Sequence, residues 1–289
     1  MVLLLESPIW LQWLGGHPAT IVAMLALALA CGLLSLIVLW RRWAFLGEGV
    51  AHAGFGGAGT AWLLAAFFPA LDRTGLVDLF VINFCVLTAL GIGFVHRSGK
   101  VHPDTAIGAF LAGTMAWGFL GQQVYLNAYH RSPAGFQSLL FGQAQLLSWT
   151  HAQLAVAMLI VCLSMLTMFR KEVLLYCFDP DLARTSGVRA SLVHFMLILL
   201  ITLAIVSGVR LIGTVLITAM LILPAATAVQ ITRKLYPAAL ISCTLSVVAA
   251  IAGLTISTRW PALPEGPLIV LWLFVTFLLT WAVRHGRRE

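Results

Sequence analysis

Charged residues are scarce in this chain, because Asp, Glu, Lys and Arg together make up only 9% of its 289 residues. Soluble domains contain about 25% charged residues, so this composition excludes a soluble globular protein. Hydrophobic residues make up 61% of the chain, and the mean hydropathy is +1.00. A membrane-crossing helix needs about 20 apolar residues, so the chain is long enough for many. We therefore expect an all-α polytopic membrane protein with one transmembrane domain, residues 1–289.

Several catalytic and binding motifs are also missing. The sequence has no GxxxxGK[ST] phosphate-binding loop and no nucleophile–base set, so we expect no enzyme activity in this chain. None of the five cysteines forms a CxxC pair, which argues against disulfides and a structural zinc site. The first residues lack the basic region and cleavage site of a removable signal peptide. The net charge of +7 does not indicate nucleic-acid binding, since the basic residues lie in short loops between apolar runs.

The apolar runs predict about nine transmembrane helices. They cover residues 19–40, 46–68, 77–95, 104–120, 151–169, 191–208, 211–231, 237–257 and 267–284. If the N-terminus lies outside, the predicted inner loops hold 13 of the 17 Lys and Arg residues, and the outer loops hold only Arg73, Arg131, Arg210 and Arg259. This distribution favours an N-out, C-in topology under the positive-inside rule.

The predicted outer connection at residues 121–150 is longer than a helical hairpin needs. It contains the apolar stretch FQSLLFG, which is too short to span a bilayer. This stretch is either a gate-like half-helix at the outer surface or an ordinary amphipathic surface helix.

The long inner connection contains FDPDLARTSGV. Asp179 or Asp181 can cap a short helix with Pro180 at its first position. Gly187 can end that helix. We expect a short helix at about residues 178–188 on the cytoplasmic face, where it would dock another protein.

The second predicted span begins with a polar pair, Glu48 and His52, in the stretch GEGVAHAGFGGAG. Residues four apart share one face of a helix, and ionisable residues inside a membrane are costly and often functional. A carboxylate and an imidazole are suitable ligands for a first-row transition metal ion. Two ligands do not complete a coordination shell, so another helix, water or a symmetry mate would supply the rest. Alternatively, the pair bonds to itself and holds helices together.

Small residues follow this pair. Gly49, Gly56 and Gly57 give the span a surface nearly free of side chains, which allows helix backbones to approach closely in lipid. GFGGAG does not indicate a dinucleotide site, because no strand precedes it. Pro224 interrupts the seventh span, where it frees a backbone carbonyl and predicts a kink.

Five segments, in this order and spacing, resemble a known family: WRRWAFLGEGVAHAGFGG, DTAIGAFLAGTMAWGFL, SLLFGQAQLL, FDPDLARTSGV and GTVLITAMLILPAATA. The chain is similar, over about residues 19–284, to the ABC-3 permease subunits of bacterial ABC importers for zinc, manganese and iron. The resemblance implies a type II ABC importer-like permease in the bacterial cytoplasmic membrane. It also implies a homodimer, two separate ATPase subunits and an extracytoplasmic metal-binding protein.

The resemblance assigns roles to residues already singled out. The second span of the family usually begins Gly-Asp-x-x-x-His, and its acid and histidine are thought to bind the ion. In this chain Glu48 and His52 match those two positions, with Glu in place of Asp. The inner segment matches the coupling helix that contacts the ATPase, which assigns coupling to Asp179, Pro180, Asp181, Leu182, Ala183 and Gly187. Zn, Mn or Fe would pass transiently, with no tightly bound cofactor.

Two other functions fit the residues. An ABC permease for a larger chelate, such as haem or a siderophore, would not need the carboxylate–imidazole pair. A secondary transporter would use Glu48 and His52 as a proton relay and would work without an ATPase.

Overall fold

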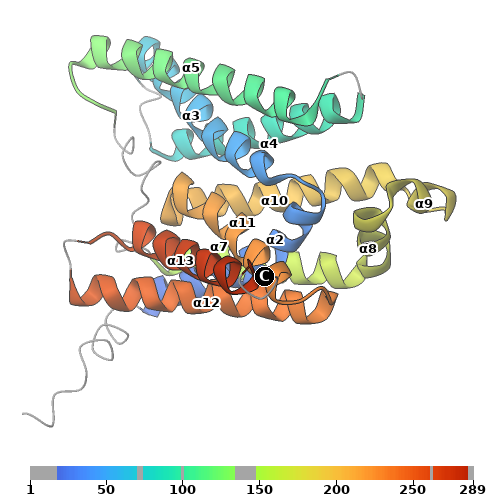
Figure 1. Ribbon diagram of the computed structural model, residues 1–289. Coiled ribbons are helices and arrows are strands. Elements are labelled where there is room, and N and C mark those ends of the chain that lie inside the picture. The colour runs from blue at the N-terminus through green and yellow to red at the C-terminus, as the bar shows by residue number, and fades with distance from the viewer. Residues whose placement is uncertain (1–17, 70–73, 99–100, 134–147, 261–262, 286–289) are drawn as a thin grey trace, which may run out of the picture. The chain divides into compact units, whose positions relative to one another are not determined.

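The computed structural model describes residues 18–69, 74–98, 101–133, 148–260 and 263–285. Every long element in these ranges is a helix (Figure 1). The helices are α2 (Pro18–Trp40), α3 (Ala44–Phe67), α4 (Thr74–Ser98), α5 (Pro103–Tyr129), α7 (Trp149–Met168), α8 (Arg170–Phe178), α9 (Pro180–Thr185), α10 (Ala190–Ile212), α11 (Thr214–Ile231), α12 (Leu235–Arg259) and α13 (Glu265–His285).

Each of the nine predicted spans coincides with one long helix. Eight of these helices, in the described part of the chain, are long and apolar enough to cross a bilayer. The helix outside this group is α5, whose C-terminal part carries Gln122, Gln123 and Asn127. The predicted span ended at residue 120, whereas α5 continues to Tyr129. The first nine residues of the predicted outer connection are therefore helical, and the FQSLLFG stretch lies outside the described residues.

The chain divides into two compact units. The first contains α2, most of α7, and α11, α12 and α13. Here α2 packs against α11 and α12, which both pack against α13. The α2–α12 contact has a polar centre, where the Ser242 hydroxyl donates to the Gly32 carbonyl at 2.8 Å and lies 2.8 Å from the Ser35 hydroxyl. These short side chains satisfy each other's hydrogen bonds, as an apolar surrounding requires.

The second unit contains α3, α4, α5, α8, α9 and residues 190–210 of α10. Its most extensive contacts join α3 to α5 and α4, so α3 is the central helix of this group (Figure 1). Two hydrogen bonds fasten α5 to α3: the Trp117 indole donates to the Thr60 hydroxyl at 2.9 Å, and the Tyr129 hydroxyl donates to the Ala65 carbonyl at 2.9 Å. The helix that carries Glu48 and His52 therefore packs against α4 and α5 and is hydrogen-bonded to α5.

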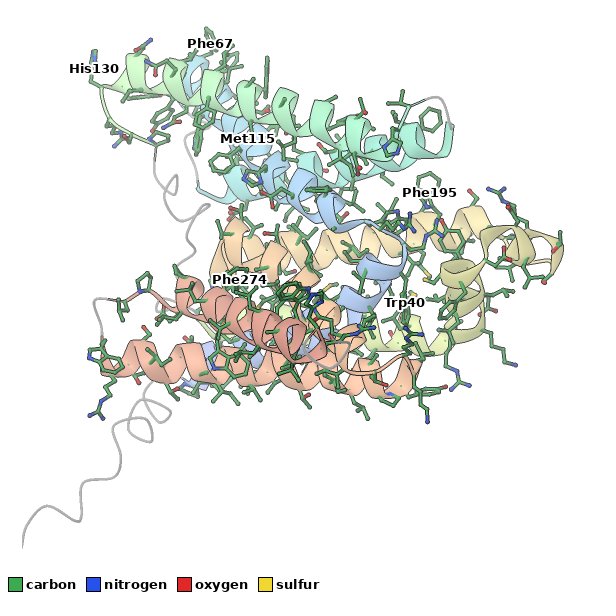
Figure 2. All side chains as sticks on the ribbon, in the orientation of Figure 1. Trp40, Phe67, Met115, His130, Phe195 and Phe274 are labelled. Atoms are coloured by element: carbon green, nitrogen blue, oxygen red, sulfur yellow. The ribbon has the colours of Figure 1, made fainter. Side chains whose placement is uncertain are left out.

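Large apolar side chains stay exposed on both units. Phe67 of α3 and Phe274 of α13 are examples that Figure 2 labels. Exposed aromatic and aliphatic side chains in such numbers would be a liability in water, but they suit a surface that faces hydrocarbon. The described helices thus have the composition and the exposed surface of a multi-pass membrane protein.

Candidate metal site on helix α3

The Glu48–His52 pair lies in the first turns of α3. A turn at Arg42, which has a φ of 56°, separates this helix from α2. One helical turn joins Glu48 to His52, and the Nδ1 atom of His52 lies 3.2 Å from the Glu48 Oε1 atom. The same nitrogen lies 3.1 Å from the Glu48 backbone oxygen. The structure therefore brings the two predicted ligands together on one face of one helix.

The two side chains differ in accessibility. The Glu48 side chain is 42% exposed and the His52 side chain is 15% exposed. The His52 ring also stacks near the Phe55 ring, at a centroid distance of 6.3 Å. Among the residues that the structure describes, no third His, Cys, Asp or Glu joins the pair to form a metal-binding group. The pair can supply one imidazole and one carboxylate, which is half of a tetrahedral shell.

The glycines of α3 determine how closely its neighbours approach. A Cβ atom built on Gly57 would lie 2.6 Å from the Phe80 carbonyl oxygen of α4, and one built on Gly59 would lie 2.5 Å from the Gly118 Cα atom of α5. These neighbours are backbone atoms, so no side-chain rotation could make room. Gly49 and Gly56 instead face side chains: Ile107 of α5 at 2.9 Å and the Phe84 ring of α4 at 2.5 Å.

The expected short inner helix is present as α9. Its N-cap is Asp179, whose Oδ1 atom accepts hydrogen bonds from the backbone N–H groups of Asp181 (3.0 Å) and Leu182 (2.9 Å). Pro180 occupies the first helical turn. At the other end Gly187 has a φ of 81°, a conformation that favours glycine. The sequence alone did not decide whether Asp179 or Asp181 is the N-cap, and the geometry assigns this role to Asp179.

The surface of α9 has two sides. Leu182 is 50% exposed and the Asp181 side chain is 90% exposed, whereas Ala183 is fully buried. Asp181 also accepts a 3.2 Å hydrogen bond from Arg184, within the same helix. Of the predicted coupling residues, Asp181 and Leu182 are thus accessible to another protein, and Ala183 anchors α9 to its own unit.

Sequence reasoning missed a buried polar cluster around His194 of α10. Its Nδ1 atom lies 2.8 Å from the Tyr176 hydroxyl of α8, and its Nε2 atom lies 3.4 Å from the Gly93 carbonyl oxygen of α4. The Trp43 ring meets the imidazole edge-on at 5.3 Å, just before α3 begins. This cluster joins α8, which leads directly into α9, to α10 and α4 and to the start of α3.

Helix α8 was also missed, because no helix was predicted between the fifth span, which ends at residue 169, and the short inner helix at about residues 178–188. Pro224, by contrast, lies where the sequence put it, buried inside α11. A proline ring in a helix interior removes one backbone hydrogen bond and bends the helix.

A family model described as the ABC 3 transport family matches residues 18–284. The chain belongs to the ABC 3 transport family. A relative from Listeria monocytogenes, the manganese transport system membrane protein MntC, is 28% identical over 90% of this chain and 88% of its own length. The zinc transport system membrane protein TroC of Treponema pallidum is 29% identical over 87% of this chain and 83% of its own.

The fold of this ABC 3 family member is also similar to a solved structure. PsaBC from Streptococcus pneumoniae, in complex with Fab, matches with a TM-score of 0.76 and 25% identity, over 94% of this chain and 95% of that chain. The family, the relatives and the apolar helices agree that the chain is a multi-pass permease of the ABC metal-transport type. These relatives are named as membrane proteins of transport systems, in agreement with the predicted permease.

Proposed function

We propose that this chain is the membrane-spanning subunit of an ATP-driven importer for a divalent transition metal ion, and that Glu48 and His52 contact the ion as it crosses. The observation that carries the proposal is the position of this pair: a carboxylate and an imidazole, 3.2 Å apart, on the central helix of one unit. Such a pair suits Zn, Mn and Fe. The names of the relatives, which specify manganese in one case and zinc in another, point to the same class of cargo.

The incomplete shell supports a transient site. Two protein ligands and added water bind an ion less tightly than a closed four-ligand structural site does, and a transported ion has to leave again. The remaining ligands would come from water or from a second copy of the chain, and we propose a homodimer for that reason.

The exposed side of α9 supports a separate ATPase as partner. Leu182 and Asp181 project from a helix that is capped at both ends, so they form a rigid contact of small area. Movement of α9 would pass into α8 and, through the Tyr176–His194 hydrogen bond, into α10. With an N-out, C-in topology in a bacterial cytoplasmic membrane, this contact faces the ATPase, and an extracytoplasmic protein delivers the metal on the other side.

The test is uptake of labelled Zn, Mn and Fe by cells that carry Glu48→Gln or His52→Ala. We expect both variants to lose most uptake of the cognate ion, because each removes one of the two ligands. The matched control is the exposed pair at the start of α5, His102 and Asp104, whose Nδ1 and Oδ2 atoms lie 3.8 Å apart. His102→Ala and Asp104→Asn should leave uptake unchanged. Normal uptake by Glu48→Gln and His52→Ala, at normal protein levels, would remove the ligand assignment.

A further inference from the structure

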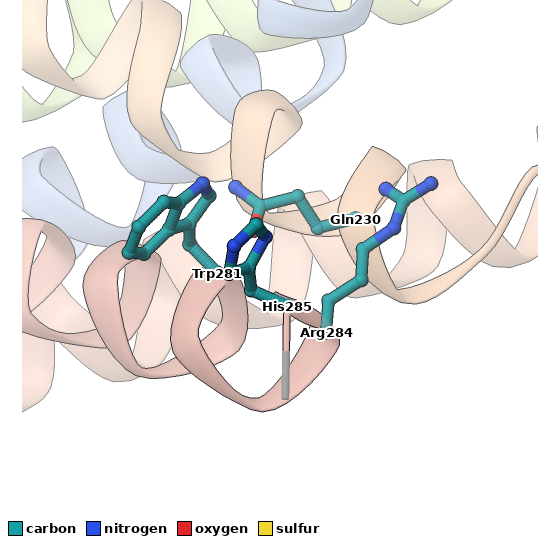
Figure 3. Close-up of a pocket in the computed structure, with 4 residues that line it drawn as sticks. All are labelled: Gln230, Trp281, Arg284 and His285. Atoms are coloured by element: carbon teal, nitrogen blue, oxygen red, sulfur yellow. The ribbon is translucent and has the colours of Figure 1, made fainter. Parts of the chain in front are cut away.

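A pocket of about 290 Å³ lies where α11 and α13 end. It is lined by Gln230 near the end of α11 and by Trp281, Arg284 and His285 in the last turns of α13 (Figure 3). All four residues belong to the first compact unit, whereas Glu48 and His52 belong to the second. The metal site proposed above therefore does not account for this pocket.

Each of the four described lining residues brings at least one hydrogen-bond donor to the pocket. The Arg284 guanidinium, the Trp281 indole, the Gln230 amide and the His285 ring all carry N–H groups. The Gln230 side-chain oxygen lies 3.5 Å from the Thr280 hydroxyl, which is closer to two backbone carbonyl oxygens of its own helix, at 2.9 and 3.0 Å. In the described part of the chain, no acidic side chain lines the pocket. Several donors and one permanent positive charge match an anion with several oxygens, above all a phosphate group.

The aromatic part of the lining is held in place. The Trp281 and His285 rings stack at a centroid distance of 5.4 Å, with only 8° between their planes. Trp281 is nevertheless 54% exposed, so one of its faces stays open. A tryptophan that is partly buried beside a cationic residue is typical of the zone where a bilayer meets water.

The position of the pocket along the chain also indicates that it lies where the bilayer meets water. Arg233 and Lys234 lie just beyond the C-cap residue of α11, Thr232, and α13 ends in Arg284 and His285. Under the positive-inside rule, this basic end lies at the cytoplasmic surface. Basic pockets between transmembrane helices on that surface bind the headgroups of anionic lipids.

We propose that this pocket binds the phosphate group of an anionic phospholipid headgroup. Arg284 pairs with the phosphate oxygens, Gln230 and His285 donate further hydrogen bonds, and Trp281 packs against the glycerol region. The pocket volume lies near the lower end of the range for small-ligand sites, roughly 300–1,000 Å³, which suits a headgroup. A bound lipid would bridge α11 to α13 and strengthen the contact between these two helices.

The test is lipid binding to the purified full-length protein in detergent, measured by native mass spectrometry and by the shift in melting temperature. The probes are phosphatidylglycerol, phosphatidylcholine and inorganic phosphate, each added alone. Phosphatidylglycerol should bind best and raise the melting temperature most. Arg284→Gln should weaken its binding roughly fivefold, and Arg284→Lys should lose less. The control Arg233→Gln removes the same charge near the pocket and should bind like the unaltered protein.

Three results would overturn the proposal. In the first, phosphatidylglycerol binds no better than phosphatidylcholine. In the second, Arg233→Gln weakens binding as much as Arg284→Gln does, which would indicate a general charge effect. In the third, inorganic phosphate alone gives the full melting shift, which would make the site one for a soluble phosphate. None of these results depends on metal uptake, so the proposed transport function is tested separately.

Discussion

Replacing Gly57 by alanine tests whether backbone contact between α3 and α4 holds the central helix in place. A Cβ atom at this position would lie 2.6 Å from the Phe80 carbonyl oxygen and 2.6 Å from the Val81 Cα atom. Normal contacts between such atoms are about 3.5 Å, so the two helices would have to separate by about 1 Å. Overpacking of this kind destabilises a fold by about 1–3 kcal/mol.

A second glycine supplies the matched control. Alanine is favoured over glycine in a helix by about 1 kcal/mol, and this gain would partly hide the packing cost in Gly57→Ala. At Gly113 of α5 a Cβ atom would have no heavy atom within 4 Å, so Gly113→Ala records the helix-propensity gain alone. The free energy of unfolding should therefore be lower for Gly57→Ala than for Gly113→Ala by about 1–3 kcal/mol.

The assay is unfolding of the purified full-length protein in detergent, by denaturant titration and by thermal melting, for the two variants side by side. Uptake of the cognate ion should fall with Gly57→Ala, because the helix that moves carries Glu48 and His52. Equal stability of the two variants would refute the argument that α3 and α4 are in backbone contact at this point.

Two further predictions concern the connection from α9 to α10. Asp179→Ala removes the acceptor of two backbone N–H groups and should destabilise α9 by about 1 kcal/mol. The amount of co-purifying ATPase should fall with Asp179→Ala, whereas Asp179→Asn should retain most of it. Unchanged co-purification with Asp179→Ala would contradict the proposed docking role. Tyr176→Phe leaves the Nδ1 atom of buried His194 without its 2.8 Å partner and should cost about 1–3 kcal/mol in thermal melting experiments. The control Tyr236→Phe alters a side chain that is 63% exposed and should leave the melting temperature unchanged. Equal shifts in melting temperature for Tyr176→Phe and Tyr236→Phe would show that the buried hydrogen bond contributes no stability.

Local signals predicted most of the helices. A run of about 20 apolar residues identifies a span by itself, and this rule located the long helices with small errors at their ends. The inner helix α9 was also predictable, because its Asp-Pro start and glycine end are local capping signals. The pairing of Glu48 with His52 followed from their spacing alone, since residues four apart share a helix face.

Features that depend on distant residues were not predictable. His194 meets Tyr176 across 18 positions and Gly93 across 101, and no local pattern indicates such partners. The C-terminal part of α5 looked like a loop because it is polar. Its Gln123 amide, however, donates to the Asn127 side chain one turn later, at 3.3 Å, as polar residues on an exposed helix face do.

Helix α8 was missed for a different reason, although the fifth predicted span ended at residue 169, beside the end of α7 at Met168. Only one residue separates α7 from α8, and its backbone φ and ψ of −101° and 27° lie outside the helical range. The nine residues of α8 are too few to span a bilayer, and no side chain caps its N-terminus.

The contacts of the His52 ring determine the position of one proton. Both atoms close to Nδ1, the Glu48 backbone oxygen and its Oε1 atom, are hydrogen-bond acceptors. They favour the neutral tautomer that carries its hydrogen on Nδ1 and has its lone pair on Nε2. A backbone oxygen and a carboxylate of the same helix therefore set the orientation of the imidazole, with Nδ1 toward Glu48. The α3 helix alone thus determines that Nε2 is the nitrogen which a metal ion would meet in the proposed site.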